Sequence, residues 1–202
     1  MGDNALSMRK LVLPILIVAA FGCAKHETPT PKAPPPAAAK VNPPTQSAPA
    51  PAEKTQTADV GQAMPPYTTA LLDGKKFDIA AEHGNVVFLN LWATWCGPCR
   101  FEIPELQSMH QKYASRGFKV VGVSLDDTGV DGVKQFVAKH SMTYPIAYDP
   151  EGKLAAIFQS SVLPTSVIVD RSGQIVWKKF GAVSMDDSTL TAALTKALDA
   201  KS

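Results

Sequence analysis

Two cysteines separated by two residues follow a strongly apolar run in the segment Phe88-Leu89-Asn90-Leu91-Trp92-Ala93-Thr94-Trp95-Cys96-Gly97-Pro98-Cys99-Arg100. The run that leads into them, residues 86–92, is almost continuously apolar, which is typical of a central strand covered on both faces. Beyond the second cysteine, apolar side chains recur at the spacing of a helix face, at Ile103, Leu106 and Met109. The sequence therefore predicts that the cysteine pair lies where a buried strand passes into a helix.

The spacing and place of the two cysteines favour dithiol exchange. Such exchange needs one thiolate that attacks and a second thiol that resolves the mixed disulfide. At the start of a helix, unpaired N–H groups and the helix dipole lower the pKa of the first thiol, while the second thiol lies one turn inward. We therefore expect Cys96 to face solvent as the nucleophile and Cys99 to be the resolving thiol. Pro98 suits the first helical turn because its missing N–H has no partner to lose there.

A zinc site is the main structural alternative for a Cys-x-x-Cys pair, and it needs two more ligands at comparable spacing. The third cysteine, Cys23, lies near the N-terminus, and His83, His110 and His140 are about thirty residues apart. No metal site is therefore predicted.

The composition predicts one globular domain with additional segments. The chain has 202 residues, 45% of them hydrophobic, and a formal net charge of +2 whose basic residues are scattered among acids. This pattern offers no basic surface to a nucleic acid, so no nucleic-acid partner is expected. Strand-like and helix-like patterns alternate within residues 60–202, which indicates an α/β domain. Strands are expected at 68–72, 76–79, 86–92, 119–125, 144–148, 165–170 and 174–180, and helices from the cysteine pair to residue 113 and at 130–140, 151–158 and 187–200.

The first residues of the chain predict export. A basic pair precedes the apolar residues 11–21, which is the layout of an export signal and too short a run to span a membrane. The run ends at Cys23 in a pattern that resembles the lipobox of bacterial lipoproteins, so we interpret residues 1–22 as a signal peptide and Cys23 as the lipidated residue. An ordinary signal peptide or an uncleaved anchor is the alternative, since Phe21 stands where the tightest lipobox has a small residue. By the same resemblance, Ala24 after the cysteine favours the outer membrane.

Residues 24–59 are rich in Pro and Ala and contain almost no large apolar side chain. Such a segment cannot bury enough apolar surface to offset the entropy lost on ordering. We predict a disordered linker between the anchor and the domain, which proline makes extended and semi-rigid.

The segment of residues 88–100, together with Val162-Leu163-Pro164-Thr165 far downstream, resembles the TlpA/ResA-like thioredoxin family over roughly residues 60–200. The resemblance implies a thioredoxin fold, a central mixed sheet flanked by helices, with an N-terminal β-hairpin and a TlpA-type α/β insertion. It also implies a cis bond before Pro164, which lies against the cysteine pair in that family and leaves the backbone of Leu163 free to bind an extended substrate. The residues that match the substrate groove or its rim are Trp95, Gly97, Pro98, Leu163, Pro164, Gly181 and Ala182.

Glu102 matches a glutamate that helps to move protons near the cysteines in ResA-like proteins. Asn90 stands where thioredoxins carry a buried aspartate for that task. An acid–base group is useful because Cys99 must lose its proton before it attacks the mixed disulfide. The alternative for Glu102 is a first-turn carboxylate that interacts only with the helix dipole.

The function implied by the resemblance is thiol–disulfide exchange in the bacterial envelope, without a cofactor. The dipeptide Gly97-Pro98 is that of reducing thioredoxins, so we expect a periplasmic, lipid-anchored reductase of disulfide-bearing client proteins such as apocytochrome c. In an oxidising compartment it depends on a membrane electron donor of the DsbD or CcdA kind. A disulfide-forming oxidase and a non-catalytic binding module stay open. So does a peroxiredoxin-like peroxide reductase, although Ala93 and Leu89 replace the Thr and Pro of that class.

Overall fold

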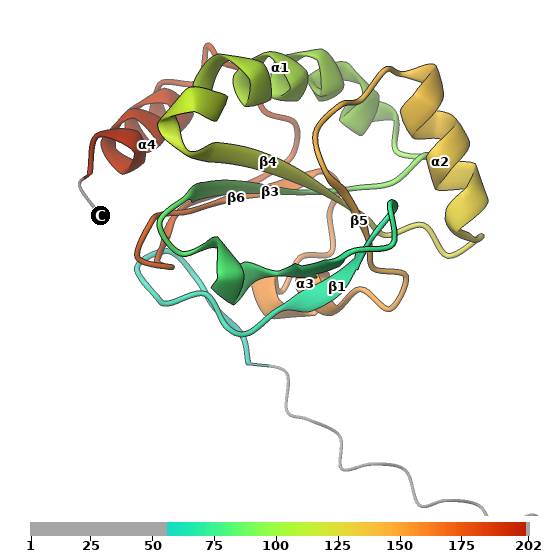
Figure 1. The fold of residues 1–202 in the computed structure, drawn as a ribbon, viewed down its shortest axis with the longest axis horizontal. Coiled ribbons are helices and arrows are strands. Elements are labelled where there is room, and N and C mark those ends of the chain that lie inside the picture. The colour runs from blue at the N-terminus through green and yellow to red at the C-terminus, as the bar shows by residue number, and fades with distance from the viewer. Residues whose placement is uncertain (1–55, 201–202) are drawn as a thin grey trace, which may run out of the picture. The chain divides into compact units, whose positions relative to one another are not determined.

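The computed structural model describes residues 56–200. Within them, seven strands form one mixed sheet in the order β2-β1-β5-β4-β3-β6-β7, with helices on both of its faces (Figure 1). The strands are β1 (Thr68–Leu71), β2 (Lys76–Asp78), β3 (Val86–Trp92), β4 (Phe118–Ser124), β5 (Ile146–Tyr148), β6 (Thr165–Val169) and β7 (Ile175–Phe180). The helices are α1 (Gly97–Tyr113), α2 (Val130–Lys139), α3 (Lys153–Phe158) and α4 (Ser188–Asp199), with short 3-10 helices at Ile79–Glu82 and Ala114–Arg116. The expected mixed sheet flanked by helices is confirmed.

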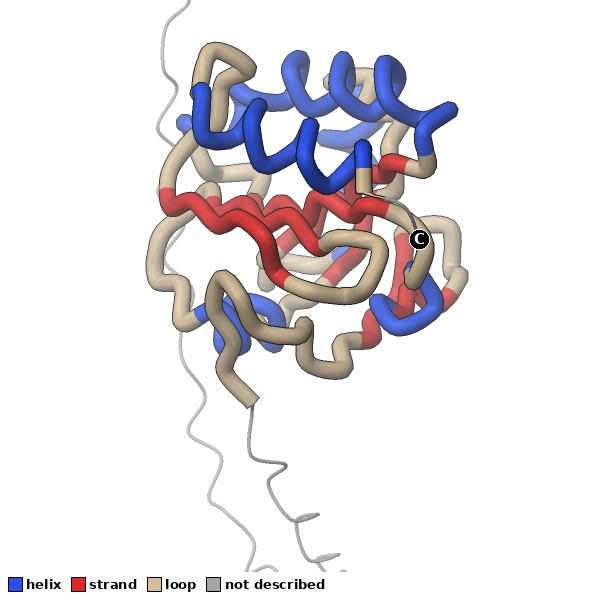
Figure 2. Tube along the Cα trace, turned by 90° about the vertical axis from the view of Figure 1, so that its left-hand side faces the viewer, coloured by secondary structure: helices blue, strands red, loops and turns tan. Residues whose placement is uncertain are grey.

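Strand β3 lies inside the sheet, between β4 and β6. It pairs in parallel with β4 and antiparallel with β6, and all seven of its residues are buried. Apolar side chains form two buried clusters, one that includes residues of α1 and α4 and another that includes residues of α3. Figure 2 shows helices on either side of the strands. Because side chains alternate along a strand, β3 supplies Phe88 and Trp92 to the first cluster and Leu89 and Leu91 to the second. The continuous apolar run in the sequence is therefore the consequence of burial on two faces.

Helix α2 and strand β5 lie between β4 and α3 in the chain. Strand β5 pairs in parallel with β4 and antiparallel with β1, whose other neighbour is β2. The N-terminal hairpin and an additional α/β segment are therefore both present, and they extend the sheet on the β4 side.

Two predicted strands differ from the structure for local reasons. Ile79, expected at the end of a strand, begins a 3-10 helix because the Asp78 side chain accepts a hydrogen bond from the N–H of Ala80 (3.1 Å) and caps it. Tyr144 lies outside β5, which begins only after Pro145. Proline has no N–H to give to a sheet, so the strand starts one residue beyond it.

The described chain begins with a segment that packs onto the domain before the first strand. Ala58 is buried, and its N–H donates to the carbonyl of Ile157 in α3 (2.9 Å). Asp59 forms an ion pair with Lys178 of β7 (2.8 Å). Residues 61–64 then run beside the start of β7 through backbone hydrogen bonds. Ala58 and Asp59 thus pack with the domain, although composition placed them at the end of the linker.

The predicted signal peptide, Cys23 and most of the linker lie outside the described residues. Between residues 56 and 200, no helix combines the length and the apolar character that a membrane crossing requires.

Candidate active site

The two cysteines form a disulfide at the junction of β3 and α1. Their Cα atoms are 5.4 Å apart. Cys96 caps the N-terminus of α1, and its Sγ accepts a hydrogen bond from the N–H of Cys99 (3.3 Å). Gly97 and Pro98 occupy the first helical positions and are exposed. The predicted place of the pair, between a buried strand and a helix, is confirmed.

Both cysteines are almost fully buried in this disulfide form. Cys96 is 4% exposed and Cys99 is 1% exposed. The expectation that Cys96 faces solvent is therefore wrong for the oxidised state, because its Sγ is bonded to the inward-lying sulfur of Cys99. The exposed surface next to the disulfide comes from Gly97, Pro98 and the preceding Trp95.

A segment far downstream reaches the same site. The peptide bond between Leu163 and Pro164 is cis, as the resemblance implied, and Leu163 packs against the buried cluster that contains both cysteines. The N–H of Gly181 donates to the carbonyl of Pro164 (2.8 Å), so the end of β7 lies beside this loop. Leu163, Pro164 and Gly181, which the sequence assigned to one groove, are thus neighbours in the structure.

Large apolar side chains are exposed in the segments that form the site. Five such side chains are exposed within the described residues, and four of them are Trp95, Phe101, Val162 and Phe180. Trp95 is 64% exposed and Phe101 is 84% exposed. Large apolar side chains that stay exposed on segments next to a reactive group are typical of an interaction surface. Of these four side chains, sequence reasoning assigned only Trp95 to the substrate groove.

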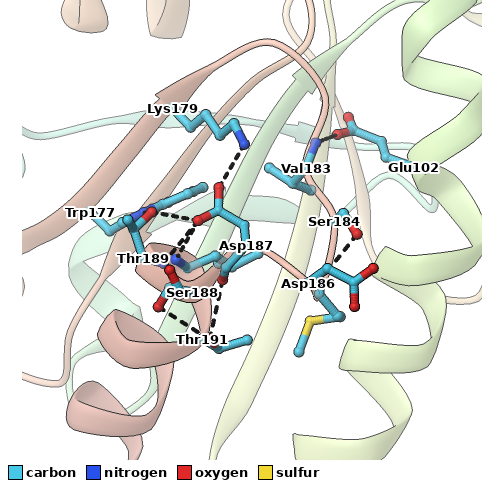
Figure 3. Close-up of polar contacts among 12 residues, drawn as sticks. Glu102, Trp177, Lys179, Val183, Ser184, Asp186, Asp187, Ser188, Thr189 and Thr191 are labelled. Carbon is cyan, nitrogen blue, oxygen red and sulfur yellow. Dashed lines mark hydrogen bonds and ion pairs between the residues drawn. The ribbon is translucent and has the colours of Figure 1, made fainter.

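Glu102 lies beyond the first turn of α1, contrary to the alternative interpretation, and it is buried. Its Oε1 accepts a hydrogen bond from Asn90 Nδ2 (2.8 Å), and its Oε2 accepts one from the N–H of Val183 (2.9 Å; Figure 3). Asn90 Nδ2 also donates to Ser166 Oγ (3.0 Å). Burial raises the pKa of Glu102 from 4.5 to about 7, although the two hydrogen bonds oppose the shift. A carboxyl group with this pKa can take up and release a proton near neutral pH.

The loop between β7 and α4 is held by two carboxylates of α1. Besides Glu102, which binds its first part, Glu105 accepts a hydrogen bond from the N–H of Met185 (2.6 Å). The loop ends at Asp187, which caps α4 and pairs with Lys179 of β7 (2.6 Å) (Figure 3). The hydrogen bond from Lys179 holds the pKa of Asp187 well below its ordinary value. The loop is therefore fixed by α1 on one side and by β7 on the other.

Sequence reasoning missed several residues that hold the site together. Ser166 and Val183 bind Asn90 and Glu102, and Asp126 holds the turn before the cysteines. Asp126 closely follows a buried strand, and in α/β folds the groups at the carboxyl ends of neighbouring parallel strands often meet at a site. The position of Asp126 could therefore have been recognised from the sequence. The sequence gives no such indication for Val183, because Val183 binds through its backbone N–H.

The fold and the dithiol define a thioredoxin-fold thiol–disulfide oxidoreductase, and comparisons with known proteins agree. The family model Redoxin matches residues 59–194. Thiol-disulfide oxidoreductase ResA of Bacillus cereus is 34% identical over 122 residues, which cover 60% of this chain and 70% of that protein.

Solved structures give the same result. A Chlorobium tepidum structure assigned as the thiol:disulfide interchange protein DsbE matches with a TM-score of 0.65 at 31% identity, covering 70% of this chain and 99% of that one. A secreted thiol-disulfide isomerase of Corynebacterium glutamicum matches with a TM-score of 0.63 at 26% identity, covering 75% and 96%. The chain belongs to the Redoxin family and, within it, to the ResA-like thiol–disulfide oxidoreductases.

Proposed function

We propose that this oxidoreductase works as a reductase of client proteins outside the cytoplasm, with Cys96 as the attacking thiol and Cys99 as the resolving thiol. The observation that carries the proposal is the position of the pair at the N-terminus of α1, where Cys96 Sγ accepts a hydrogen bond from the N–H of Cys99. The same N–H and the positive end of the helix stabilise a thiolate on Cys96.

The proposed reaction has two exchange steps. The Cys96 thiolate attacks one sulfur of the client disulfide, whose S–S bond breaks as a mixed disulfide forms, and the first client thiolate leaves and takes up a proton. Cys99 then loses its proton and attacks Cys96 Sγ, so the mixed disulfide breaks and the second client thiolate leaves and is protonated. The enzyme ends as the Cys96–Cys99 disulfide, and the client has gained two electrons and two protons.

Glu102 is the proposed acceptor of the Cys99 proton. It follows Cys99 by one turn of α1, and its carboxyl group is held by Asn90 and Val183. Because its pKa is about 7, a substantial fraction is ionised at neutral pH and ready to accept a proton. The resemblance to ResA-like proteins gives the same role.

The client is proposed to bind as an extended segment between Trp95 and the Leu163–Pro164 loop. Exposed apolar side chains on both of these segments, Trp95 on one and Val162 on the other, support this arrangement. The residues proposed to contact the client are Trp95, Gly97, Pro98, Leu163, Pro164 and Gly181. Apocytochrome c is the client that the resemblance suggests.

The protein is proposed to act in the periplasm, attached to the outer membrane by a lipid on Cys23 and supplied with electrons by a membrane donor of the DsbD or CcdA kind. The apolar residues 11–21, the lipobox-like ending and the Pro/Ala-rich linker of residues 24–59 support this. Metabolic labelling with palmitate tests the anchor: the label should enter the natural protein and be absent from Cys23→Ser. Equal labelling of both proteins would contradict it.

The reduction potential of the cysteine pair tests the direction of electron flow. The full-length protein is equilibrated in glutathione and dithiothreitol buffers, quenched and alkylated. Both active-site cysteines fall in one tryptic peptide, residues 77–100, whose mass reports the oxidised fraction without interference from Cys23. We expect a potential near or below about −250 mV, in the range of reducing thioredoxins. A potential above about −150 mV would instead assign disulfide formation to this chain.

A further inference from the structure

A buried carboxylate outside the exchange chemistry lies next to the active-site turn. Asp126 follows the last residue of β4 by two positions and is 1% exposed. Strands β3 and β4 are parallel neighbours, with Trp92 opposite Ser124, so their carboxyl ends meet at one edge of the sheet. Asp126 therefore sits beside the chain that leaves β3 for the cysteines.

Asp126 binds the turn through neutral donors. Its two oxygens accept hydrogen bonds from the N–H of Thr94 (3.0 and 3.2 Å), and Oδ1 also accepts the Thr94 hydroxyl (2.5 Å). The Ser124 hydroxyl donates to Oδ2 (2.7 Å). Hydrogen bonds to an ionised acceptor are roughly twice as strong as neutral ones. Three of the four therefore tie Asp126 to Thr94, the residue two positions before Cys96.

The carbonyl of Thr94 is held from the opposite side. Arg100 donates to it through Nη2 (2.7 Å) and Nε (3.3 Å), and the guanidinium group lies over the ring of Phe136 in α2 (5.7 Å). The turn itself is closed by the N–H of Cys96, which donates to the carbonyl of Ala93 (3.1 Å). Every backbone and side-chain polar group of Thr94 is thus bound, and the residues that follow it are the exposed Trp95 and the helix cap Cys96.

We propose that Asp126 is a positioning residue for thiol–disulfide exchange, which fixes Thr94 and thereby the orientation of Trp95 and Cys96 toward the client. The inference rests on the dithiol chemistry proposed above, but not on its direction. The carboxylate of Asp126 forms its hydrogen bonds with Thr94 and Ser124 and with neither cysteine, so it acts through Thr94. An isolated buried charge is unfavourable unless hydrogen bonds satisfy it, and here those bonds converge on the one turn that carries the nucleophile.

Variants of Thr94 separate positioning from the effect of charge, because they leave the carboxylate in place. Thr94→Val removes the hydroxyl donor, Thr94→Ser retains it, and Asp126→Ala removes all the acceptors. Asp127→Asn is the matched control, since Asp127 is the next residue, is exposed, and loses the same charge. Asp126→Asn keeps the shape of the side chain and serves if Asp126→Ala does not fold.

The readout is the second-order rate constant of the reduced full-length protein with the disulfides of insulin. Each rate constant is divided by the fraction of Cys96 that is present as thiolate. That fraction is obtained from the pH dependence of Cys96 alkylation, measured on the tryptic peptide of residues 77–100. Asp126→Ala should slow exchange by about tenfold to a hundredfold, the range known for small displacements of a reacting group. Thr94→Val should slow it in the same direction, while Thr94→Ser and Asp127→Asn should keep the natural rate.

A double variant tests whether Asp126 acts through Thr94. If it does, Asp126→Ala combined with Thr94→Val is no slower than Asp126→Ala alone, so the two effects do not add. Corrected rates within about twofold of the natural protein for Thr94→Val and for folded Asp126→Ala, or Asp126→Asn in its place, would overturn the inference, and so would additive effects. The reduction potential of the natural protein is measured separately. If the potential shows that the protein is an oxidase, the same variants are compared in the oxidation of a dithiol client. An error in the proposed direction of electron flow is thereby distinguished from an error in the proposed role of Asp126.

Discussion

Replacing Glu102 by Gln should change how the stability of the domain depends on pH. Burial raises the pKa of this carboxyl group from 4.5 to about 7, which corresponds to about 3 kcal/mol of unfavourable free energy when the group is ionised in the folded protein. In the unfolded chain the group titrates near 4.5. Between pH 7 and 4.5 the folded state therefore binds this proton more tightly than the unfolded state, and the contribution of Glu102 to the stability should rise as the pH falls through that interval.

Glutamine cannot ionise, so this gain disappears in Glu102→Gln. The amide also places one donor where the carboxylate accepts from both Asn90 Nδ2 and the N–H of Val183, and one mismatched buried pair costs about 1–3 kcal/mol. At pH 8 the lost charge offsets much of this mismatch, and the two proteins should have similar free energies of unfolding. At pH 5 the variant should be less stable, by up to about 3 kcal/mol.

Urea unfolding of the oxidised full-length protein and of the variant, at half-unit steps from pH 5 to 8, measures the effect. The difference between the two proteins cancels every other titrating group. Glu151→Gln is the control, because Glu151 is exposed and pairs only with Lys153 at the surface; its pH slope should match that of the natural protein. The reasoning is refuted if Glu102→Gln keeps the natural slope between pH 5 and 7.

Two further predictions concern side chains distant from the cysteines. Arg171 donates to the carbonyls of Gly84 (2.6 Å) and Arg116 (2.7 Å), so Arg171→Met should lower the free energy of unfolding by about 2–4 kcal/mol, and Arg171→Lys should recover only part of it, as urea titration can measure. His110 Nδ1 accepts the N–H of Val120 (3.3 Å), and burial lowers the pKa of His110 below 6.5. The unfolded chain therefore takes up this proton first, and the contribution of His110 to the stability should fall as the pH drops below about 6.5. His110→Gln should lack this loss in melting curves between pH 7 and 5, and an unchanged curve would contradict the assignment.

The loop between β7 and α4 connects the proton-accepting group with the substrate rim. It begins at Gly181, whose N–H binds the carbonyl of Pro164, and two residues later Val183 binds Glu102. A client lying against the Leu163–Pro164 loop is therefore near a backbone segment that also sets the hydrogen bonding of Glu102. The pKa of Glu102 and the shape of the proposed substrate groove therefore both depend on residues 181–183.

The sequence by itself determined the features that arise from neighbouring residues. A continuous apolar run predicted β3, the two-residue spacing placed Cys96 and Cys99 at a helix start, and the motif around Pro164 identified the second loop. These signals are local, because burial on both faces of a strand and capping of a helix leave their mark on consecutive residues.

Only the tertiary structure decided which distant groups meet. The bonds from Asn90 to Glu102, from Val183 to Glu102 and from Thr94 to Asp126 join residues 12, 81 and 32 positions apart. Such contacts depend on strand register, on the order of strands in the sheet and on backbone N–H groups that every residue carries. The sequence pattern therefore located the thiols, whereas the packing of β4, β6 and the β7–α4 loop around β3 fixed the pKa of Glu102 and the anchoring of the active-site turn.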